Sequence, residues 1–203
     1  MGARTRAYVG LAFASAVGTL FAVQGVAPAL PAMADDLGVT DAQLGLFTAA
    51  YMLPAAALAV PLGFLADTLG RRRVFVTMAL LYSLAGGAQA WAGDYEQLLV
   101  LRFVQGIGFG GLMPLSLTLI GDVLRGAAQF RAQSRRQIAM SGGEFVLPLV
   151  GGALATAGWE LALGAQAALL PLAVAGLFVL ADSRPGCRGC WRPASCASSA
   201  SSR

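Results

Sequence analysis

Two charged residues stand inside long apolar stretches of this sequence. Arg102 lies in the run 98–120, and Glu144 lies near the start of the run 138–157. A charge at the centre of a bilayer is unfavourable by roughly 2.5–3.5 kcal/mol, so each should face a cavity or a partner. Burial favours the protonated form of a carboxyl, so we expect Glu144, if it is buried, to take up and release a proton. Both residues are candidates for proton coupling or for a cavity charge. The alternatives are that Arg102 snorkels to the headgroups and that Glu144 simply faces water.

The stretch 63–73 places Asp67 where an apolar run ends, between Gly63 and Gly70 and ahead of three arginines, Arg71, Arg72 and Arg73. Gly63 allows another helix backbone to approach closely. Gly70 supplies the backbone freedom that a short connection needs. Asp67 can pair with the arginines or meet a helix N-terminus. The alternative interpretation is an ordinary arginine-rich hairpin at the membrane surface.

Two glycine-rich segments indicate close helix packing, because small residues let helix backbones approach each other. Pro148 removes a backbone donor and should kink or loosen its helix. The candidates for packing and kink are Gln105, Gly106, Gly110, Gly143, Pro148, Gly151 and Gly152. The polar or aromatic candidates for a substrate cavity are Gln24, Tyr51 and Gln89, with Glu144.

Such residues need a scaffold, and the composition indicates a membrane protein. Of 203 residues, 57% are hydrophobic and 12% are charged, and the mean hydropathy is +0.69. Soluble domains are about a quarter charged, and disordered chains are poor in apolar residues, so both classes are excluded. A spanning helix needs about 20 apolar residues. Six segments qualify, and they must be helical because an open strand edge is unsatisfied in lipid: 7–30, 44–66, 74–92, 98–120, 138–157 and 161–181. The first run is too long for a cleaved signal peptide.

The charges alternate with the predicted spans. All basic residues are arginines, and thirteen of the fourteen fall on one side. The other side instead carries acidic residues, namely Asp35, Asp36, Asp41, Asp94, Glu96 and Glu160. The positive-inside rule then predicts a multi-pass protein of the cell membrane with both termini cytoplasmic. Arginines clustered between apolar runs are unlike a nucleic-acid-binding face, so we expect no nucleic-acid partner.

The domain organisation is a transmembrane domain, residues 1–181, followed by a polar tail, residues 182–203, which we expect to be disordered and cytoplasmic. From its abrupt change in composition, we expect this tail to be a truncated end. Its Cys187 and Cys190 have metal-like spacing, but no second pair and no His supply further ligands, so we expect no metal and no cofactor. No nucleophile–base pair is evident, so we expect no enzyme.

The first three spans weakly resemble the last three. Val23–Val26 echoes Val104–Ile107, and Tyr51–Pro54 echoes Phe145–Pro148. The matching spans run in opposite directions, which is the plan of a 3+3 inverted repeat with a site near the midplane. Chance recurrence of short apolar words is the alternative.

The motifs together resemble a known family. The stretch 63–73 resembles the signature loop between the second and third helices of the major facilitator superfamily. The stretch 102–111 is similar to its fourth-helix motif, and the stretch 143–152 to the fifth-helix motif of its proton-coupled efflux antiporters. The order and spacing of the three motifs agree with those of the superfamily across residues 7–181. Thr68 stands where the family usually has a basic residue, and Leu147 where the efflux motif usually has Gly.

This resemblance implies an all-α polytopic membrane protein whose six helices form half of a twelve-helix, alternating-access transporter. It implies that the 63–73 loop belongs to a cytoplasmic gate closed against a second half, and that Arg102 takes part in proton coupling. We expect proton-coupled efflux of small amphipathic compounds, by a truncated or half-size form. The partners would be a small-molecule substrate, protons, the lipid bilayer, and a second six-helix half or another copy. The alternatives are proton symport of sugars or organic acids and, in another class, a non-transporting fragment or interaction module.

Overall fold

The computed structural model describes residues 3–180, and all regular elements of this part are helices. Their bounds are α1 Ala3–Gln24, η1 Ala27–Ala29, α2 Leu30–Leu37, α3 Asp41–Leu69, α4 Arg71–Ala88, η2 Gln89–Trp91, α5 Tyr95–Val123, α6 Gly126–Ala155, α7 Trp159–Gly164, η3 Ala165–Leu169 and α8 Leu170–Val179. The predicted tail, residues 182–203, lies outside the described residues.

Six helical stretches of residues 3–180 are long and apolar enough to cross a membrane. They are Thr5–Leu37, Asp41–Leu69, Arg71–Trp91, Tyr95–Val123, Gly126–Ala155 and Trp159–Val179. The prediction of an all-α fold with six spans is confirmed. Several helices continue beyond the apolar runs, because helix formation does not stop where polarity rises. The clearest case is α6, which begins at Gly126 although its apolar run began at residue 138.

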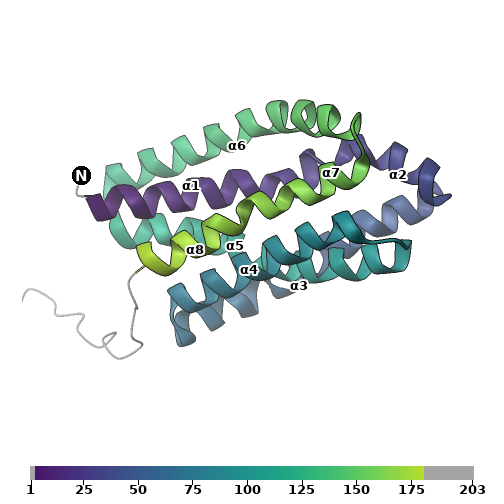
Figure 1. Cartoon of the computed structure of the whole chain (residues 1–203). Helices are drawn as coiled ribbons and strands as arrows, with labels where there is room; N and C mark the ends of the chain where they lie inside the picture. The colour runs from purple at the N-terminus through teal and green to yellow at the C-terminus, as the bar shows by residue number, and fades with distance from the viewer. Residues whose placement is uncertain (1–2, 181–203) are drawn as a thin grey trace, which may run out of the picture.

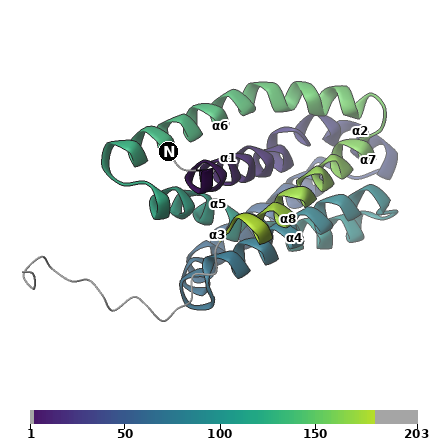
Figure 2. The same cartoon turned by 60° about the vertical axis from the view of Figure 1, so that its left-hand side comes forward.

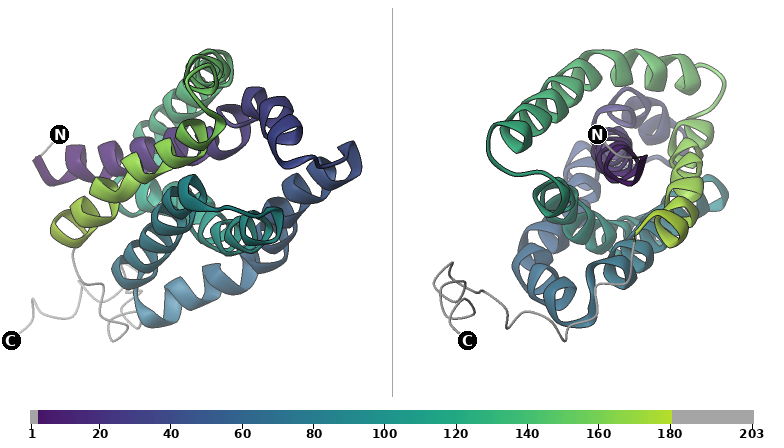
Figure 3. Two further views of the ribbon diagram at one scale, coloured as in Figure 1. Left: turned by 45° about the vertical axis from the view of Figure 1, so that its right-hand side comes forward. Right: turned by 90° about the vertical axis from the view of Figure 1, so that its left-hand side faces the viewer.

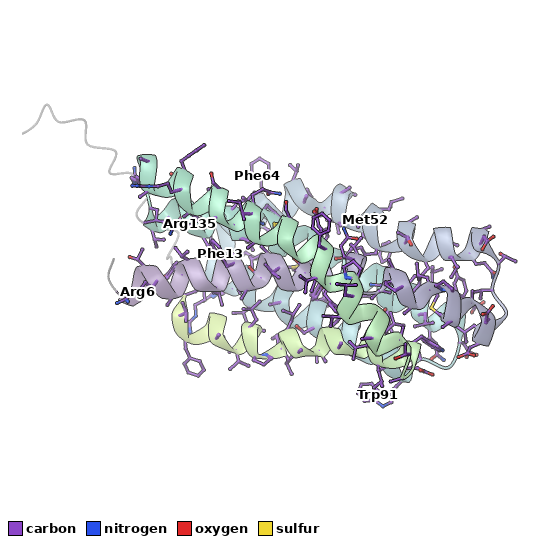
Figure 4. The ribbon with its side chains drawn as sticks, turned by 90° about the horizontal axis from the view of Figure 1, so that it is seen from above. Arg6, Phe13, Met52, Phe64, Trp91 and Arg135 are labelled. Carbon is purple, nitrogen blue, oxygen red and sulfur yellow. The ribbon has the colours of Figure 1, made fainter. Side chains whose placement is uncertain are left out.

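The six stretches pass back and forth between two ends of the bundle (Figure 1). One end, which we call the arginine end, holds the start of α1, the α3–α4 and α5–α6 connections and the end of α8. The opposite end, the acidic end, holds the connections α2–α3, α4–α5 and α6–α7. Figure 4 shows Arg6 and Arg135 toward the arginine end, and it shows Phe64 and Trp91 projecting away from the bundle. Exposed apolar side chains of this kind suit a lipid environment.

The connections are short, and local signals define them. Each of the four connections at residues 38, 70, 126 and 158 contains a glycine with positive φ. Gly70, with φ 98°, lies between α3 and α4, as the turn prediction required. At the acidic end, Thr40 forms a capping box with Gln43, whose Oε1 accepts a bond from the Thr40 N–H at 2.8 Å. The cap starts α3 by satisfying an N–H that the helix leaves free.

Helix α5 lies at the centre and packs against α1, α3 and α4, while α6 packs against α1 (Figures 2 and 3). The close approach depends on glycines along α5. A Cβ at Gly106 would collide with the Tyr51 carbonyl of α3, and one at Gly110 would lie 2.8 Å from the Ala55 carbonyl. The segment 106–111 thereby brings α3 against α5 and sets the position of the site.

Candidate functional site

Arg102 lies inside the bundle. Its side chain projects from α5 about 10 Å along the helix from Tyr95, and the residue is only 2% exposed. Its Cζ atom lies 4.4 Å from the centroid of the Phe47 ring and 5.5 Å from that of Tyr51, both on α3. Cation–π attraction therefore holds the guanidinium against α3. This placement fits a charge that faces the interior and differs from snorkelling to the headgroups.

A chain of three buried glutamines holds the other side of the guanidinium. Arg102 Nη1 donates to Gln105 Oε1 at 2.9 Å, and Gln89 Nε2 donates to the same oxygen at 3.0 Å. Gln105 Nε2 in turn donates to Gln166 Oε1. The network links α5 to η2 and η3, which are two of the three places where the described spans change from α to 3₁₀ geometry. Buried polar networks of this kind fix one arrangement of a core.

A cavity of about 140 Å³ lies between the end of α1, η1, α3 and α5, beside Arg102. The residues that line it are Ala22, Val23, Gln24, Val26, Ala27, Leu30, Phe47, Thr48, Tyr51, Met52 and Arg102. Most of the lining is apolar or aromatic, and Arg102 is its one charged member. A mostly apolar pocket with a few polar groups is typical of small-molecule sites.

The predicted site residues divide between this cavity and other places. Gln24, Tyr51 and Arg102 line the cavity together. Gln89 is fully buried in the glutamine network and does not line it. Glu144 lies on an exposed part of α6 and is not among the cavity residues.

The signature stretch 63–73 forms an ion-pair cluster at the arginine end. Arg71 Nη2 lies 3.3 Å from Asp67 Oδ1, and Arg71 Nη1 pairs with Asp122 at the end of α5. Arg72 Nη2 donates to the Leu177 carbonyl of α8 at 2.6 Å. The connection between α3 and α4 is thus tied to two other spans of this chain. A Cβ at Gly63 would meet no atom within 4 Å, so the described residues show no close helix approach there.

The packing candidates on α6 lie where α6 meets the first span. A Cβ on Gly151 would collide with the backbone of Gly25, and one on Gly143 would lie 3.3 Å from Leu20. Gly152 has only an ordinary contact with Pro28, at 3.7 Å. Pro148 lies inside α6, which runs unbroken from Gly126 to Ala155.

Three functional candidates were not predicted from the sequence. Gln166 completes the glutamine network, and Asp122 completes the ion-pair cluster. Arg136 was counted with the loop arginines, yet it is 4% exposed on α6, where its Nη2 donates to Ser116 Oγ at 2.7 Å. Helical spacing from Ala132 to Arg136 and Met140 could have indicated its buried face. For Asp122 the signal was an acidic residue on the arginine-rich side. Gln166 had no signal beyond being a polar residue in an apolar run.

The family follows from a match to residues 12–188 of this chain, which fit the family model described as Major Facilitator Superfamily. The chain belongs to the major facilitator superfamily. The resemblance of its three motifs is thereby confirmed as membership.

Curated members of the superfamily match parts of the chain. A protein of Cupriavidus necator named as a probable sulfoacetate transporter is 33% identical over 136 residues, covering 66% of this chain and 32% of that protein. A bacillibactin exporter of Bacillus subtilis is 31% identical over 140 residues, covering 65% and 35%. A multidrug transporter of the same species is 34% identical over 108 residues, covering 53% and 20%. The matched part of the chain thus spans about a third or less of the length of these superfamily members.

Proposed function

We propose that this superfamily member takes part in secondary active transport by alternating access, as a proton-coupled exporter of small amphipathic compounds. The observation that carries the proposal is the apolar cavity with a single buried guanidinium, held between α3 and the glutamine network. The apolar lining suits an amphipathic compound. The relatives named as exporter and multidrug transporter support the outward direction.

Proton coupling would use Arg102, with Glu144 as the second candidate. Arg102 stands at the cavity wall, where protonation of a nearby group or the arrival of cargo changes the local electrostatics most strongly. Glu144 lies on an exposed part of α6, so it would act through a group of the partner half. The cavity would be emptied and filled as the ion-pair cluster of Asp67, Arg71 and Asp122 opens and closes at the cytoplasmic side.

The part of the relatives that the match leaves uncovered supports a partner for this chain. Because the matched part of the chain covers only about a third of each of these relatives, we propose that the chain works with a second six-helix half or with another copy of itself. Both termini would lie in the cytoplasm and the arginine end would face it, in the cell membrane. Blue-native electrophoresis of the chain in mild detergent should show a mass above that of the monomer when the partner is present.

A second candidate direction is uptake of organic acids by proton symport. The cationic wall of the cavity and the sulfoacetate relative favour it. Flux in cells that overexpress the chain separates the two directions, because an exporter lowers and an importer raises the accumulation of the same compound.

The test uses vesicles with an imposed pH gradient, containing the 203-residue chain with and without a six-helix partner half. Ethidium and fluorescein serve as a cationic and an anionic amphipathic probe. We expect gradient-driven movement of at least one probe, and its loss in the variant Arg102→Ala, which should still insert. Failure of both probes to move under a gradient, with the partner half present, would contradict the proposal.

A further inference from the structure

The charge of Arg102 has no counter-charge in the described part of the chain. Two ion pairs among the described side chains join Arg71 to Asp67 and to Asp122, and both lie at the far end of the bundle. No carboxylate of a described residue lies within 4.0 Å of the Arg102 nitrogens, and no acidic residue lines the cavity. A buried cation without a counter-ion is unfavourable, and a bound anion would remove that penalty.

The hydrogen-bonding capacity of Arg102 is also only partly used. A guanidinium carries five N–H donors in one plane. Nη1 is bonded to Gln105, whereas Nε is buried without a partner among the described residues. The Phe47 ring contacts Arg102 through cation–π attraction, which does not satisfy the N–H groups in the guanidinium plane. Arg102 lines the cavity, and guanidinium donors that lack a protein partner are suited to a planar oxygen acceptor. Carboxylates fit this geometry best.

The rest of the cavity defines the body of such a ligand. Val23, Phe47 and Met52 supply an apolar and aromatic wall, and Gln24 and Thr48 supply neutral polar groups. The volume of about 140 Å³ suits a compact molecule. We propose that the cavity binds a small organic acid, with its carboxylate on Arg102 and its apolar or aromatic body against Phe47. The inference rests on the proposed transport function and specifies its substrate class as organic anions.

The experiment measures binding, and so it needs neither a gradient nor a partner half. The 203-residue chain is placed in nanodiscs of phosphatidylcholine and titrated by calorimetry with benzoate and with its neutral isostere benzamide. We expect benzoate to bind at least about tenfold more tightly, as a charge-assisted bond predicts. Equal affinity for the two probes would overturn the proposal.

Variants locate the preference on the guanidinium. Arg102→Gln should abolish the preference for benzoate, and Arg102→Lys should keep part of it because the charge remains without the planar fork. Arg136→Gln is the matched control, because it removes another buried guanidinium that does not line the cavity. We expect that control to retain the full preference. If Arg136→Gln lost the preference for benzoate and Arg102→Gln kept it, the assignment of the anion site to Arg102 would be overturned.

A second variant covers the case in which Arg102→Gln fails to fold. Thr48 lines the same cavity as Arg102 and is exposed, so Thr48→Glu adds a carboxylate to the cavity and keeps Arg102. The added carboxylate should displace benzoate and erase the preference, and a folded variant that keeps the preference would contradict us.

Nanodiscs with added phosphatidylglycerol test the lipid headgroup as the anion. Unchanged benzoate affinity supports an organic acid, and competitive loss would assign the site to lipid.

The two proposals can fail separately. If ethidium is transported but benzoate binds no more tightly than benzamide, the transport function is supported and the proposal of an organic-anion substrate is contradicted. Benzoate preference without gradient-driven movement would leave the anion site and remove the transport proposal.

Discussion

Arg102 shows how single side chains define the site. Its guanidinium lies between aromatic rings of α3 and the side-chain amide of Gln105. Arg102 also lines the cavity. Gln105 is the central residue of the network, because its oxygen accepts two bonds and its nitrogen donates a third. The placement of Arg102 therefore depends on a residue that, from the sequence, was a candidate for packing alone.

Replacing Gln105 tests this dependence. Gln105→Ala leaves Arg102 Nη1 and Gln166 Oε1 buried without partners and removes one of the two acceptors of Gln89 Nε2. We therefore expect it to lower the free energy of unfolding by roughly 2–4 kcal/mol. Denaturation by SDS, followed by circular dichroism, measures the change. Gln97→Ala is the matched control, since Gln97 is exposed on the same helix, and it should have little effect. Equal loss in both variants would show that the network does not stabilise the core.

For single residues, the sequence predicted which side chain is of functional interest better than it predicted the side chains around it. A charge inside an apolar run is visible in one dimension, so Arg102 was found and its inward placement expected. The rings that hold it come from residues 47 and 51, and the glutamines that bond to its partner Gln105 come from residues 89 and 166. These positions are distant in sequence and carry no shared pattern. The arginine at 136 was misplaced because polar neighbours hid the start of α6, while the fold buries one face of that helix.

Helix packing around α5 explains why its glycines matter to the site. Gly106 contacts the backbone of Tyr51, so α3 presents Phe47 and Tyr51 to Arg102 at cation–π distance. Gly63 on α3 faces open space in the described part of the chain. The two glycines thus differ in what they contribute within the six-helix unit, although both belong to motifs of the superfamily. The 3+3 inverted repeat remains a prediction.

A pair of alanine substitutions separates the two glycines. Gly106→Ala forces a Cβ into the Tyr51 carbonyl, so we expect α3 and α5 to move apart, with a loss of about 1–3 kcal/mol of stability. Gly63→Ala has room, and in a helix interior Ala is favoured over Gly, so its unfolding midpoint should stay the same or rise. SDS unfolding curves of both variants decide the point. A larger loss for Gly63→Ala would contradict the packing described for α3.

The ion-pair cluster at the arginine end connects α3, α4 and α5 through Arg71. Its members are partly exposed, with side-chain exposures of 26% for Arg71 and 39% for Asp122, so water and salt weaken the pair. A double-mutant cycle of Arg71→Gln and Asp122→Asn should give a coupling energy of about 0.2–1 kcal/mol. The coupling should shrink at high salt. A coupling that salt leaves unchanged would mean that the cluster is held by contacts other than charge.

The whole molecule is a bundle with chemically different ends. Figure 1 shows the α3–α4 and α5–α6 connections at one end of the bundle, and most of the described arginines belong to this end in the sequence. Most of the described acidic residues belong to the connections at the other end. Composition and charge alternation predicted this organisation well, because lipid imposes the same requirement on every span. The cavity could not be predicted in the same way, since its walls come from three spans whose contacts arise only from packing.

Membrane orientation underlies the proposed transport function, and thiol labelling measures it directly. Cysteines are introduced singly at Gly93, at the acidic end, and at Ala128, at the arginine end, in a chain whose three native cysteines are replaced by serine. Both positions are exposed. We predict that an impermeant maleimide labels Gly93→Cys in intact cells and labels Ala128→Cys only after permeabilisation. Labelling of Ala128→Cys in intact cells, with Gly93→Cys protected, would contradict the six-span orientation and with it the assignment of the arginine end to the cytoplasm.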